Sequence, residues 1–345
     1  MSIETVLGPI EPKKLGKTLT HEHIRLSYTC CFAKPPMEHH MKRINENFIK
    51  LENLGFVRQY PYSHIYNLAF RDETLEDMIA EVKLFKEMGG DSIVEVTTEG
   101  IEPDYEFLRE VSKGTGVNII CCTGYYLGHT LSDEVKNASV DDLVKNMVQD
   151  LKVGRNGIKA GVIGEVGLQY PMAVVERKSL IASGKAQAEM KCPLIIHPGR
   201  AAEAPYEIID VLREAGADIS KTVISHLDRT LRSCESLLKF AAYSDCYLEF
   251  DLFGIEVSHY QFGDEIDFPS DAQRVEWIKA LVDGGYGDRV VIAHDIHTRH
   301  RLSRYGGHGY GHILENVVPK MLARGIAQDA IDKMLIENPK RWLTW

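Results

Sequence analysis

The chain has 345 residues, of which 44% are hydrophobic, and its formal net charge is -10 at pH 7. A chain of this length can bury a large core. Its acidic balance argues against a nucleic-acid partner, because nucleic-acid binders neutralise phosphates with Lys and Arg. No uncharged apolar run approaches the roughly 20 residues that span a bilayer, and the N-terminal stretch lacks a secretory signal. The seven cysteines show no CxxC spacing, as expected of reduced thiols. We therefore expect a soluble, cytoplasmic protein with no membrane partner.

Short apolar runs alternate with longer stretches along most of the chain. The runs span three to five residues, as expected of strands that are buried on both faces. In chain order they are residues 17–20, 92–96, 118–122, 161–164, 193–196, 223–225, 247–251 and 290–294. Eight such strands alternating with helices predict an α/β fold, a (β/α)8 TIM barrel that forms one domain over residues 1–345.

The stretches between the strands show apolar residues at three- and four-residue spacing, which is typical of amphipathic helices. The expected helices cover residues 74–88, 134–153, 173–190, 204–215, 232–242 and 272–283. No GxGxxG or GxxxxGK(S/T) motif occurs, so the glycine-rich phosphate loop common in an open doubly wound sheet is missing. The pattern thus favours a closed barrel over an open sheet.

Residues 24–71 are too long for an ordinary connection between a strand and a helix. We expect them to form an insertion after the first strand, and to act as a lid over the barrel mouth. Such a lid would exclude water and bring some of its aromatic and histidine side chains beside the substrate. The candidates are Tyr60, Tyr62, His64 and Tyr66.

Histidine and acidic side chains end five of the expected strands. His21 and His23 end the first strand, and residues two apart on a strand face the same side, where two imidazoles can hold one cation. The other strand-end residues are Glu165, His197, His226 and Asp295. The carboxyl ends of barrel strands converge on one mouth. Four imidazoles and two carboxylates in one place match the needs of two divalent cations.

Each of these residues, taken alone, also has an ordinary structural explanation. An isolated HxH pair is about as often a polar strand end as a metal site, and a single strand-end histidine is more often hydrogen-bonded within the protein. A buried Glu165 needs a partner, which a metal, a helix N-terminus or an arginine would provide. Asp295 precedes a basic segment, residues 297–304, and could anchor a salt bridge there. Only the combination points to a binuclear centre.

Several motifs resemble the phosphotriesterase branch of the amidohydrolase superfamily, and most closely its animal phosphotriesterase-related subfamily. They are residues 19–23 (LTHEH), 164–167 (GEVG), 225–229 (SHLDR), 293–301 (AHDIHTRHR), 306–310 (GGHGY) and 338–343 (NPKRWL). The resemblance covers essentially the whole chain. It implies two divalent cations, expected to be zinc. The more buried ion would be held by His21, His23 and Asp295. The more exposed ion would be held by His197 and His226. Glu165 would bridge both ions, and Asp295 and Glu165 would be the catalytic residues.

This sequence departs from the bacterial phosphotriesterases at two points. Their bridging ligand is a carboxylated lysine, whereas Glu165 stands at the matching strand end. Their acidic and histidine relay residues, after the sixth and seventh strands, are replaced by Arg229 and Leu252. Organophosphate hydrolysis is therefore not the expected activity. The animal subfamily is associated with N-acetyltaurine and similar N-acyl amino acids, so the resemblance implies an amide hydrolase for a small anionic N-acyl substrate. By analogy with the bacterial relatives it also implies a homodimer.

An anionic substrate requires a cation near the barrel mouth. Arg200, three residues after His197, is the first candidate, although a loop arginine could equally pair with Glu203 or Glu207. The other candidates for substrate contacts are Arg25, Arg299, His64 and Tyr66.

Three other functions stay open at this stage. One is a phosphotriester or lactone hydrolase. A second is a TatD-like nuclease, because residues 163–168 (IGEVGL) also resemble the glutamate strand of that group and the basic residues from Arg299 to Arg304 could meet phosphates. The third is a metal-holding binding protein without turnover, which would have no need of Asp295 as both ligand and proton carrier.

Overall fold

The computed structural model describes residues 1–345 except 72, 258 and 264–265. Eight strands form one parallel sheet in which each strand pairs with the next along the chain. They are β3 (Thr18–Glu22), β4 (Ser92–Glu95), β5 (Asn118–Thr123), β6 (Val162–Gly167), β7 (Leu194–His197), β8 (Thr222–Ile224), β9 (Tyr247–Phe250) and β10 (Val290–Ile292). The main-chain nitrogen of Asp295 donates to the carbonyl oxygen of His21 at 3.1 Å, which joins the last strand to the first. The prediction of a (β/α)8 barrel is confirmed.

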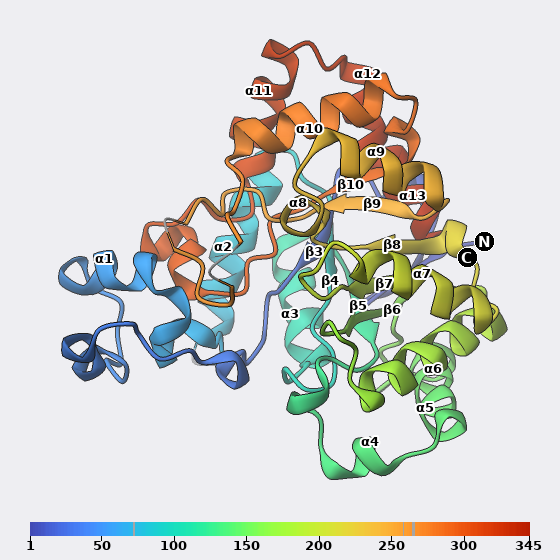
Figure 1. The fold of residues 1–345 in the computed structure, drawn as a ribbon, viewed down its shortest axis with the longest axis horizontal. Coiled ribbons are helices and arrows are strands. Elements are labelled where there is room, and N and C mark those ends of the chain that lie inside the picture. Colours follow the sequence, from blue (N-terminus) through green and yellow to red (C-terminus); the bar gives the residue numbers. More distant parts are fainter. Residues whose placement is uncertain (72, 258, 264–265) are drawn as a thin grey trace.

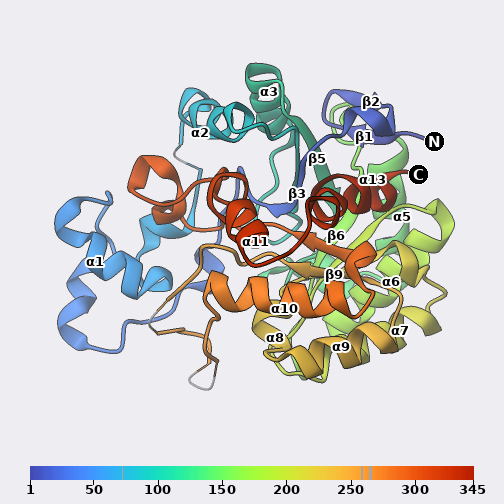
Figure 2. The same cartoon turned by 90° about the horizontal axis from the view of Figure 1, so that it is seen from above.

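Helices surround the barrel and connect successive strands (Figures 1 and 2). They are α2 (Leu75–Glu87), α3 (Tyr105–Thr115), α4 (Asp133–Asn137), α5 (Val140–Lys152), α6 (Val174–Met190), α7 (Ala204–Glu214), α8 (Leu227–Thr230), α9 (Cys234–Tyr243) and α10 (Asp271–Asp283). Three more follow β10, namely α11 (Val318–Ala323), α12 (Gln328–Asp332) and α13 (Asn338–Leu343).

The helix expected over residues 134–153 is wrong in one respect, because the structure divides it into α4 and α5. Ser139 is the N-cap of α5. Its hydroxyl accepts a hydrogen bond from the main-chain nitrogen of Asp142 at 3.1 Å, and the carboxylate of Asp142 accepts one from the nitrogen of Ser139 at 3.2 Å. This capping box begins a new helix within an otherwise continuous helical pattern.

The strands are buried on both faces, which explains their apolar sequences. On β5, Ile119 and Cys121 pack outward beneath the helices, whereas Ile120 and Cys122 belong to a second apolar cluster. That cluster also contains Leu15 and Trp342. Because the barrel is filled with side chains, polar residues are expected only where a strand reaches an end of the barrel.

The two ends of the barrel differ. The termini lie together at one end, where Ser2 and Trp345 exchange main-chain hydrogen bonds of 3.1 and 3.2 Å beside a hairpin of β1 (Ile3–Thr5) and β2 (Gly8–Ile10). Residues 24–71, which include α1 (Leu51–Gln59), lie at the opposite end. There they contact the segment after β10, because His300 donates its main-chain N–H to the side chain of Asn67 at 2.9 Å. The insertion thus lies at the carboxyl ends of the strands.

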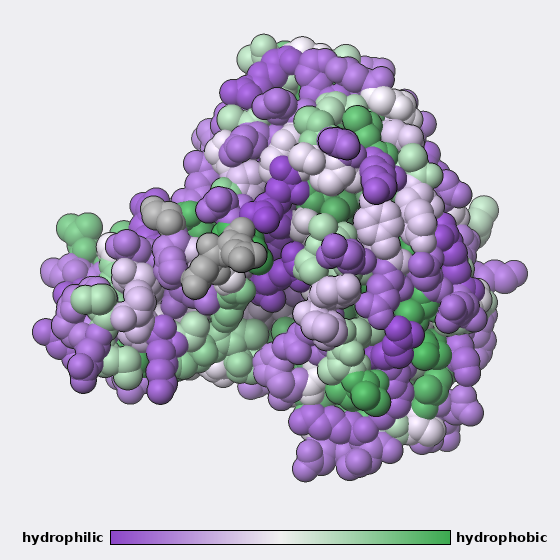
Figure 3. All heavy atoms as spheres, viewed as in Figure 1, coloured by the Kyte–Doolittle hydropathy of each residue, from purple (hydrophilic) through white to green (hydrophobic). Residues whose placement is uncertain are grey.

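Hydrophilic side chains predominate on the face shown in Figure 3, and hydrophobic side chains appear there in separate patches. Within the described part of the chain, no helix is both long enough and apolar enough to cross a membrane.

Candidate active site

The strand ends bring four histidines and two carboxylates into one buried cluster. Ligand atoms of its members lie within 4.8 Å of one another in three overlapping groups. The groups are His21, His226 and Asp295; His21, His23 and Glu165; and Glu165, His197 and His226. We call these six residues the ligand cluster. All six predicted metal-binding side chains therefore converge.

On one side of the cluster, two carboxylates face the first histidine pair. Nε2 of His23 lies 3.4 Å from Oε1 of Glu165 and 3.3 Å from Oδ1 of Asp295. Nε2 of His21 lies 3.6 Å from Glu165 and 3.8 Å from Asp295, and although it is buried it has no hydrogen-bond partner among the residues that the structure describes. Atoms held about 2.1 Å from one tetrahedral cation are roughly 3.4 Å apart. The spacing and the unpartnered nitrogen fit a divalent cation.

On the other side, Glu165 meets the second histidine pair. Its Oε2 lies 2.8 Å from Nδ1 of His197 and 3.8 Å from Nε2 of His226, and these two nitrogens are 2.9 Å apart. Both oxygens of the Glu165 carboxylate therefore face imidazole nitrogens: Oε1 faces His23, and Oε2 faces His197, His226 and, at 3.6 Å, His21. A carboxylate in this position can bridge two cations.

Polar groups outside the cluster fix how three of the imidazoles are turned. Nδ1 of His23 lies 2.8 Å from the hydroxyl of Thr97, and Nδ1 of His226 lies 2.8 Å from Asp251. Nδ1 of His21 lies 3.2 Å from Glu249. With Nδ1 occupied, Nε2 of each ring is left to face the centre. Metal-binding histidines are oriented in this way in many proteins.

Sequence reasoning missed Glu249 and Asp251, which lie on β9 and just after it. Both are fully buried. The available signal was a strand of sequence YLEF followed by Asp, in which two carboxylates interrupt an apolar run and so require partners. The partners come from β3 and β8, which only the folded barrel brings within reach.

Two residues of the ligand cluster have a left-handed main chain. His226 has φ 55° and Asp295 has φ 51°. This conformation costs roughly 1 to 2 kcal/mol for a residue with a Cβ. Such strain persists where the surrounding structure enforces it, and it is common at functional sites.

The electrostatics of the cluster favour bound positive charge. Burial alone would lower the pKa of His21, but the carboxylates of Asp251 and Glu165 outweigh it and raise the pKa to about 10. Burial would likewise raise the pKa of Glu165, but His21 and His197 hold it well below its ordinary value. For Asp295 burial acts in the same direction, and His297 and His23 hold the pKa low. Ionised carboxylates facing imidazoles are suited to a cation.

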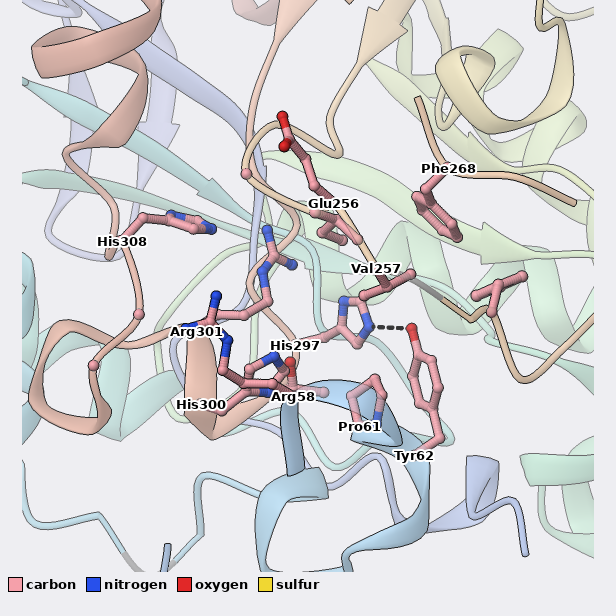
Figure 4. Close-up of a pocket in the computed structure, with 16 residues that line it drawn as sticks. Arg58, Pro61, Tyr62, Glu256, Val257, Phe268, His297, His300, Arg301 and His308 are labelled. Carbon is pink, nitrogen blue, oxygen red and sulfur yellow. Dashed lines mark hydrogen bonds between the residues drawn. The ribbon is translucent and has the colours of Figure 1, made fainter. Parts of the chain in front are cut away.

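A small cavity of about 20 Å³, the inner chamber, lies over the ligand cluster. Its other walls include Tyr28, Tyr62, Tyr126, Arg200, Arg229 and Leu252. A larger cavity of about 340 Å³, the outer chamber, adjoins it and is lined by the segments after β9 and β10 and by residues 58–62 of the insertion (Figure 4). Tyr62 is therefore the insertion residue, among those predicted, that reaches the site.

Arg200 is in the inner chamber. Its Nε donates to the hydroxyl of Tyr260 at 2.8 Å, and the guanidinium lies 5.2 Å from the ring centre of Phe262. Among the described residues no carboxylate pairs with it. Glu207, one alternative partner, is bound to Arg177 at 2.7 Å instead. Within the described part of the chain, Arg200 is thus a chamber cation with no paired anion.

Arg229 is a second chamber cation. Its side chain is only 5% exposed. One terminal nitrogen lies 3.1 Å from Nε2 of His197 and 3.0 Å from the carbonyl oxygen of Pro198. The Nε of Arg229 has no hydrogen-bond partner in the described part of the chain. No described carboxylate pairs with this guanidinium. A buried arginine without an anion favours an anionic ligand.

The other substrate-contact candidates do not line either chamber. Nδ1 of His64 accepts the main-chain N–H of Asn67 at 3.2 Å, and the ring is buried within the insertion. Tyr66 lies under the guanidinium of Arg299 at 3.7 Å. Arg25 donates to the carbonyl oxygens of Phe70 and Glu73 at 3.0 and 3.2 Å. His64 and Arg25 thus make contacts within or next to the insertion, and Tyr66 packs on the segment after β10.

The basic segment after Asp295 is used within the protein. Arg299 is paired with the buried Glu73, which also binds Arg304 at 3.1 Å. Arg301 donates to the main-chain oxygens of His294 and Asp295. These contacts occupy the arginines that a nuclease would direct at phosphates.

A (β/α)8 barrel with imidazoles and ionised carboxylates clustered at the carboxyl ends of its strands is the architecture of a metal-dependent hydrolase. The model of the phosphotriesterase family matches residues 1–343, and the chain belongs to that family. A phosphotriesterase-related protein from Nematostella vectensis is 54% identical over 99% of this chain and 98% of its own. A human protein named N-acetyltaurine hydrolase is 49% identical over the same shares of the two chains. The crystal structure of a resiniferatoxin-binding protein from Rhodobacter sphaeroides is similar with a TM-score of 0.94 and 32% identity, over 99% of this chain and 94% of that one.

Proposed function

We propose that this protein hydrolyses the amide bond of small anionic N-acyl compounds, and that N-acetyltaurine, which yields taurine and acetate, is its best candidate substrate. The observation that carries the proposal is the presence of Arg200, a guanidinium with no carboxylate partner among the described residues, in the same chamber as the ligand cluster. A substrate that fits must join an anionic head to a bond that a metal centre can hydrolyse, across a short distance. The names of relatives such as the human protein agree with this choice.

We assign two divalent cations, expected to be zinc, to the ligand cluster. His21, His23 and Asp295 would hold one ion, His197 and His226 the other, and Glu165 would bridge them. The spacing of the nitrogens and oxygens and the unpartnered Nε2 of His21 support this assignment. When bound, the cations would make water nucleophilic near neutral pH and polarise the carbonyl.

Side chains of the protein would bind the anionic head, transfer the proton and exclude water. Arg200 binds the sulfonate or carboxylate through its free terminal nitrogens, with Tyr260 holding its Nε. Asp295 is ionised at neutral pH, because its pKa is held low, and so can accept the proton that the attacking water loses. It returns that proton to the nitrogen as the C–N bond breaks and the acyl C–O bond forms. The insertion, through Tyr28 and Tyr62, covers the chamber and excludes bulk water.

A substrate screen on metal-analysed protein tests the proposal. The panel is N-acetyltaurine, acetylated amino acids, a neutral acetamide, a phosphotriester, a lactone and single-stranded DNA. We expect the highest kcat/KM for acetylated compounds with an anionic group, and loss of activity on chelation. Preference for the phosphotriester, the lactone or DNA would overturn the proposed substrate class. Turnover of none of them by fully metallated protein would support a binding protein instead.

A further inference from the structure

The inner and outer chambers share a wall. Five residues line both cavities, namely Tyr62, Ile255, Tyr260, Phe268 and His297. On the side of the ligand cluster the space is about 20 Å³, close to what one water molecule needs. On the other side it is about 340 Å³. Residues that line both cavities therefore lie between a substrate carbonyl placed at the ligand cluster and the larger space.

Tyr62 is the central part of this wall. Its hydroxyl lies 2.9 Å from Nε2 of His297, and the two rings are stacked at an angle of 12°. The Tyr62 ring also packs against Phe262, with 4.3 Å between ring centres. Figure 4 shows the hydrogen-bonded pair between Val257 and Pro61. His297 and Phe262 thus fix the Tyr62 ring from two sides, so its position in the wall is determined by specific contacts.

The two ends of an N-acyl substrate would leave the ligand cluster in different directions. Arg200, which follows β7, would hold the anionic head. The outer chamber is formed after β9 and β10. Tyr260, which binds Arg200, lies at one part of its wall, whereas His297, at another part, lies 3.2 Å from Asp295 on the opposite side of the ligand cluster from His197. Arg58 and Glu256, both exposed, place one charge of each sign at the rim of the outer chamber, and the terminal nitrogens of Arg301 already donate to main-chain oxygens. The acyl group would therefore extend toward the Asp295 side, and the opposite charges at the rim of the outer chamber suit an uncharged chain.

We propose that Tyr62 is a specificity-determining residue that restricts the acyl group to about the size of acetyl, and that the outer chamber is an acyl pocket closed off by the Tyr62 ring. The apolar side chains that an acyl chain would meet there are Pro61, Ile255, Val257 and Phe268. With the ring removed, the substrate class would extend to N-acyl compounds with chains of medium length. The inference rests on the proposed function, because it takes the orientation of the substrate from Arg200.

The test compares kcat/KM for N-acetyl-, N-butyryl- and N-hexanoyltaurine in wild type, Tyr62→Ala and Tyr62→Phe at equal metal content. In Tyr62→Ala the hexanoyl-to-acetyl ratio should rise at least about tenfold, because each added methylene is buried against apolar side chains. Tyr62→Phe is the matched control. It loses the hydrogen bond to His297 but keeps the ring, so its ratio should stay at the wild-type value.

Two further variants keep the test decisive if Tyr62→Ala fails to fold. Phe268→Ala opens the same wall from the β9 side and removes a ring that is partly exposed. Val257→Trp, added to either opened variant, refills the outer chamber and should return the ratio toward the wild-type value. A wild-type ratio in folded, fully metallated Tyr62→Ala and Phe268→Ala would overturn the proposal.

Binding gives a readout that does not depend on turnover. The ligands are the sulfonamide analogues of the same series, methanesulfonyl- and hexanesulfonyltaurine, measured by calorimetry. The hexanesulfonyl compound should gain at least about tenfold in affinity in the opened variants and little in Tyr62→Phe. If wild type hydrolyses no N-acyl compound and yet this pattern of binding is found, the proposed function fails while the acyl pocket stands. Active wild type with no such pattern rejects the pocket alone.

Discussion

Oδ1 of Asp251 lies 2.8 Å from Nδ1 of His226, and Oδ2 lies 3.2 Å from Nδ1 of His21. One buried carboxylate therefore orients imidazoles from two strands, β3 and β8, and turns Nε2 of both toward Glu165. Asp251 also accepts the main-chain N–H of His226 at 3.1 Å, which supports the left-handed main chain there. Asp251 is a positioning residue for the ligand cluster.

Asp251→Asn should lower metal affinity about 10- to 100-fold, because outer carboxylates fix the tautomer and raise the basicity of metal-binding imidazoles. Competition against a chelator of known affinity measures the change. Asp245→Asn is the control, since Asp245 is exposed and lies two residues before the same strand. Unchanged affinity in folded Asp251→Asn would show that the imidazoles are oriented without this carboxylate.

Glu165→Gln should leave the protein folded but remove one or both metals and reduce kcat by at least about two orders of magnitude, because the bridging anion offsets repulsion between the cations. Metal analysis, circular dichroism and turnover are measured on one preparation. Glu189→Gln, on the surface of α6, serves as the control. Since a glutamate needs no carbon dioxide to become anionic, metal reconstitution should also be indifferent to bicarbonate. Full metal content with near-normal turnover in Glu165→Gln would remove Glu165 from the site.

Arg200→Ala should raise KM for anionic N-acyl substrates by about 10- to 100-fold, the range expected when a charge-assisted hydrogen bond is lost. A neutral amide of similar size should be little affected. Arg177→Ala, which removes a surface ion pair with Glu207, should change neither. Equal losses on charged and neutral substrates would mark Arg200 as a structural residue.

The segment after β9 depends on a buried ion-pair network. Arg274 of α10 binds Asp228 at 2.7 Å and Asp271 at 2.8 Å, and Asp271 also contacts His312 at 2.7 Å. Burial would raise the pKa of Asp271, but His312 and Arg274 outweigh it and hold the pKa well below its ordinary value. A carboxylate of this kind stabilises the fold fully above its unfolded pKa of about 3.9, and the contribution is lost as pH falls toward the folded value.

The free energy of unfolding should therefore fall between about pH 5 and pH 3 in metal-free protein. Asp271→Asn should be less stable at pH 7 by about 3 to 5 kcal/mol, and its stability should change less over that acid range. Urea unfolding at several pH values measures both effects. Asp283→Asn at the end of the same helix is the exposed control. A parallel pH dependence in wild type and Asp271→Asn would show that other groups dominate.

Much of the fold could be predicted because buried parallel strands must be apolar on both faces. Apolar runs such as residues 193–196 and 290–294 are easily recognised in the sequence. A charged residue at the end of such a run is costly to bury, so its presence indicates a partner or a functional role. Glu165 and Asp295 stand at strand ends, and the carboxyl ends of barrel strands meet at one mouth. Their positions therefore predicted a shared site. The division of residues 134–153 into two helices could be missed, because the sign of it is Ser139 and serine also occurs within helices.

The sequence by itself determined the barrel and the six side chains that converge in it, since both follow from local patterns and from the closed order of the strands. Tertiary structure alone decided what surrounds them. Asp251 reaches His21 across 230 positions of the chain, and Tyr62 rather than His64 or Tyr66 faces the site. No local pattern encodes which member of an aromatic segment points inward. That depends on how residues 24–71 pack on the loops after β9 and β10, and such packing is set by contacts between side chains far apart in sequence.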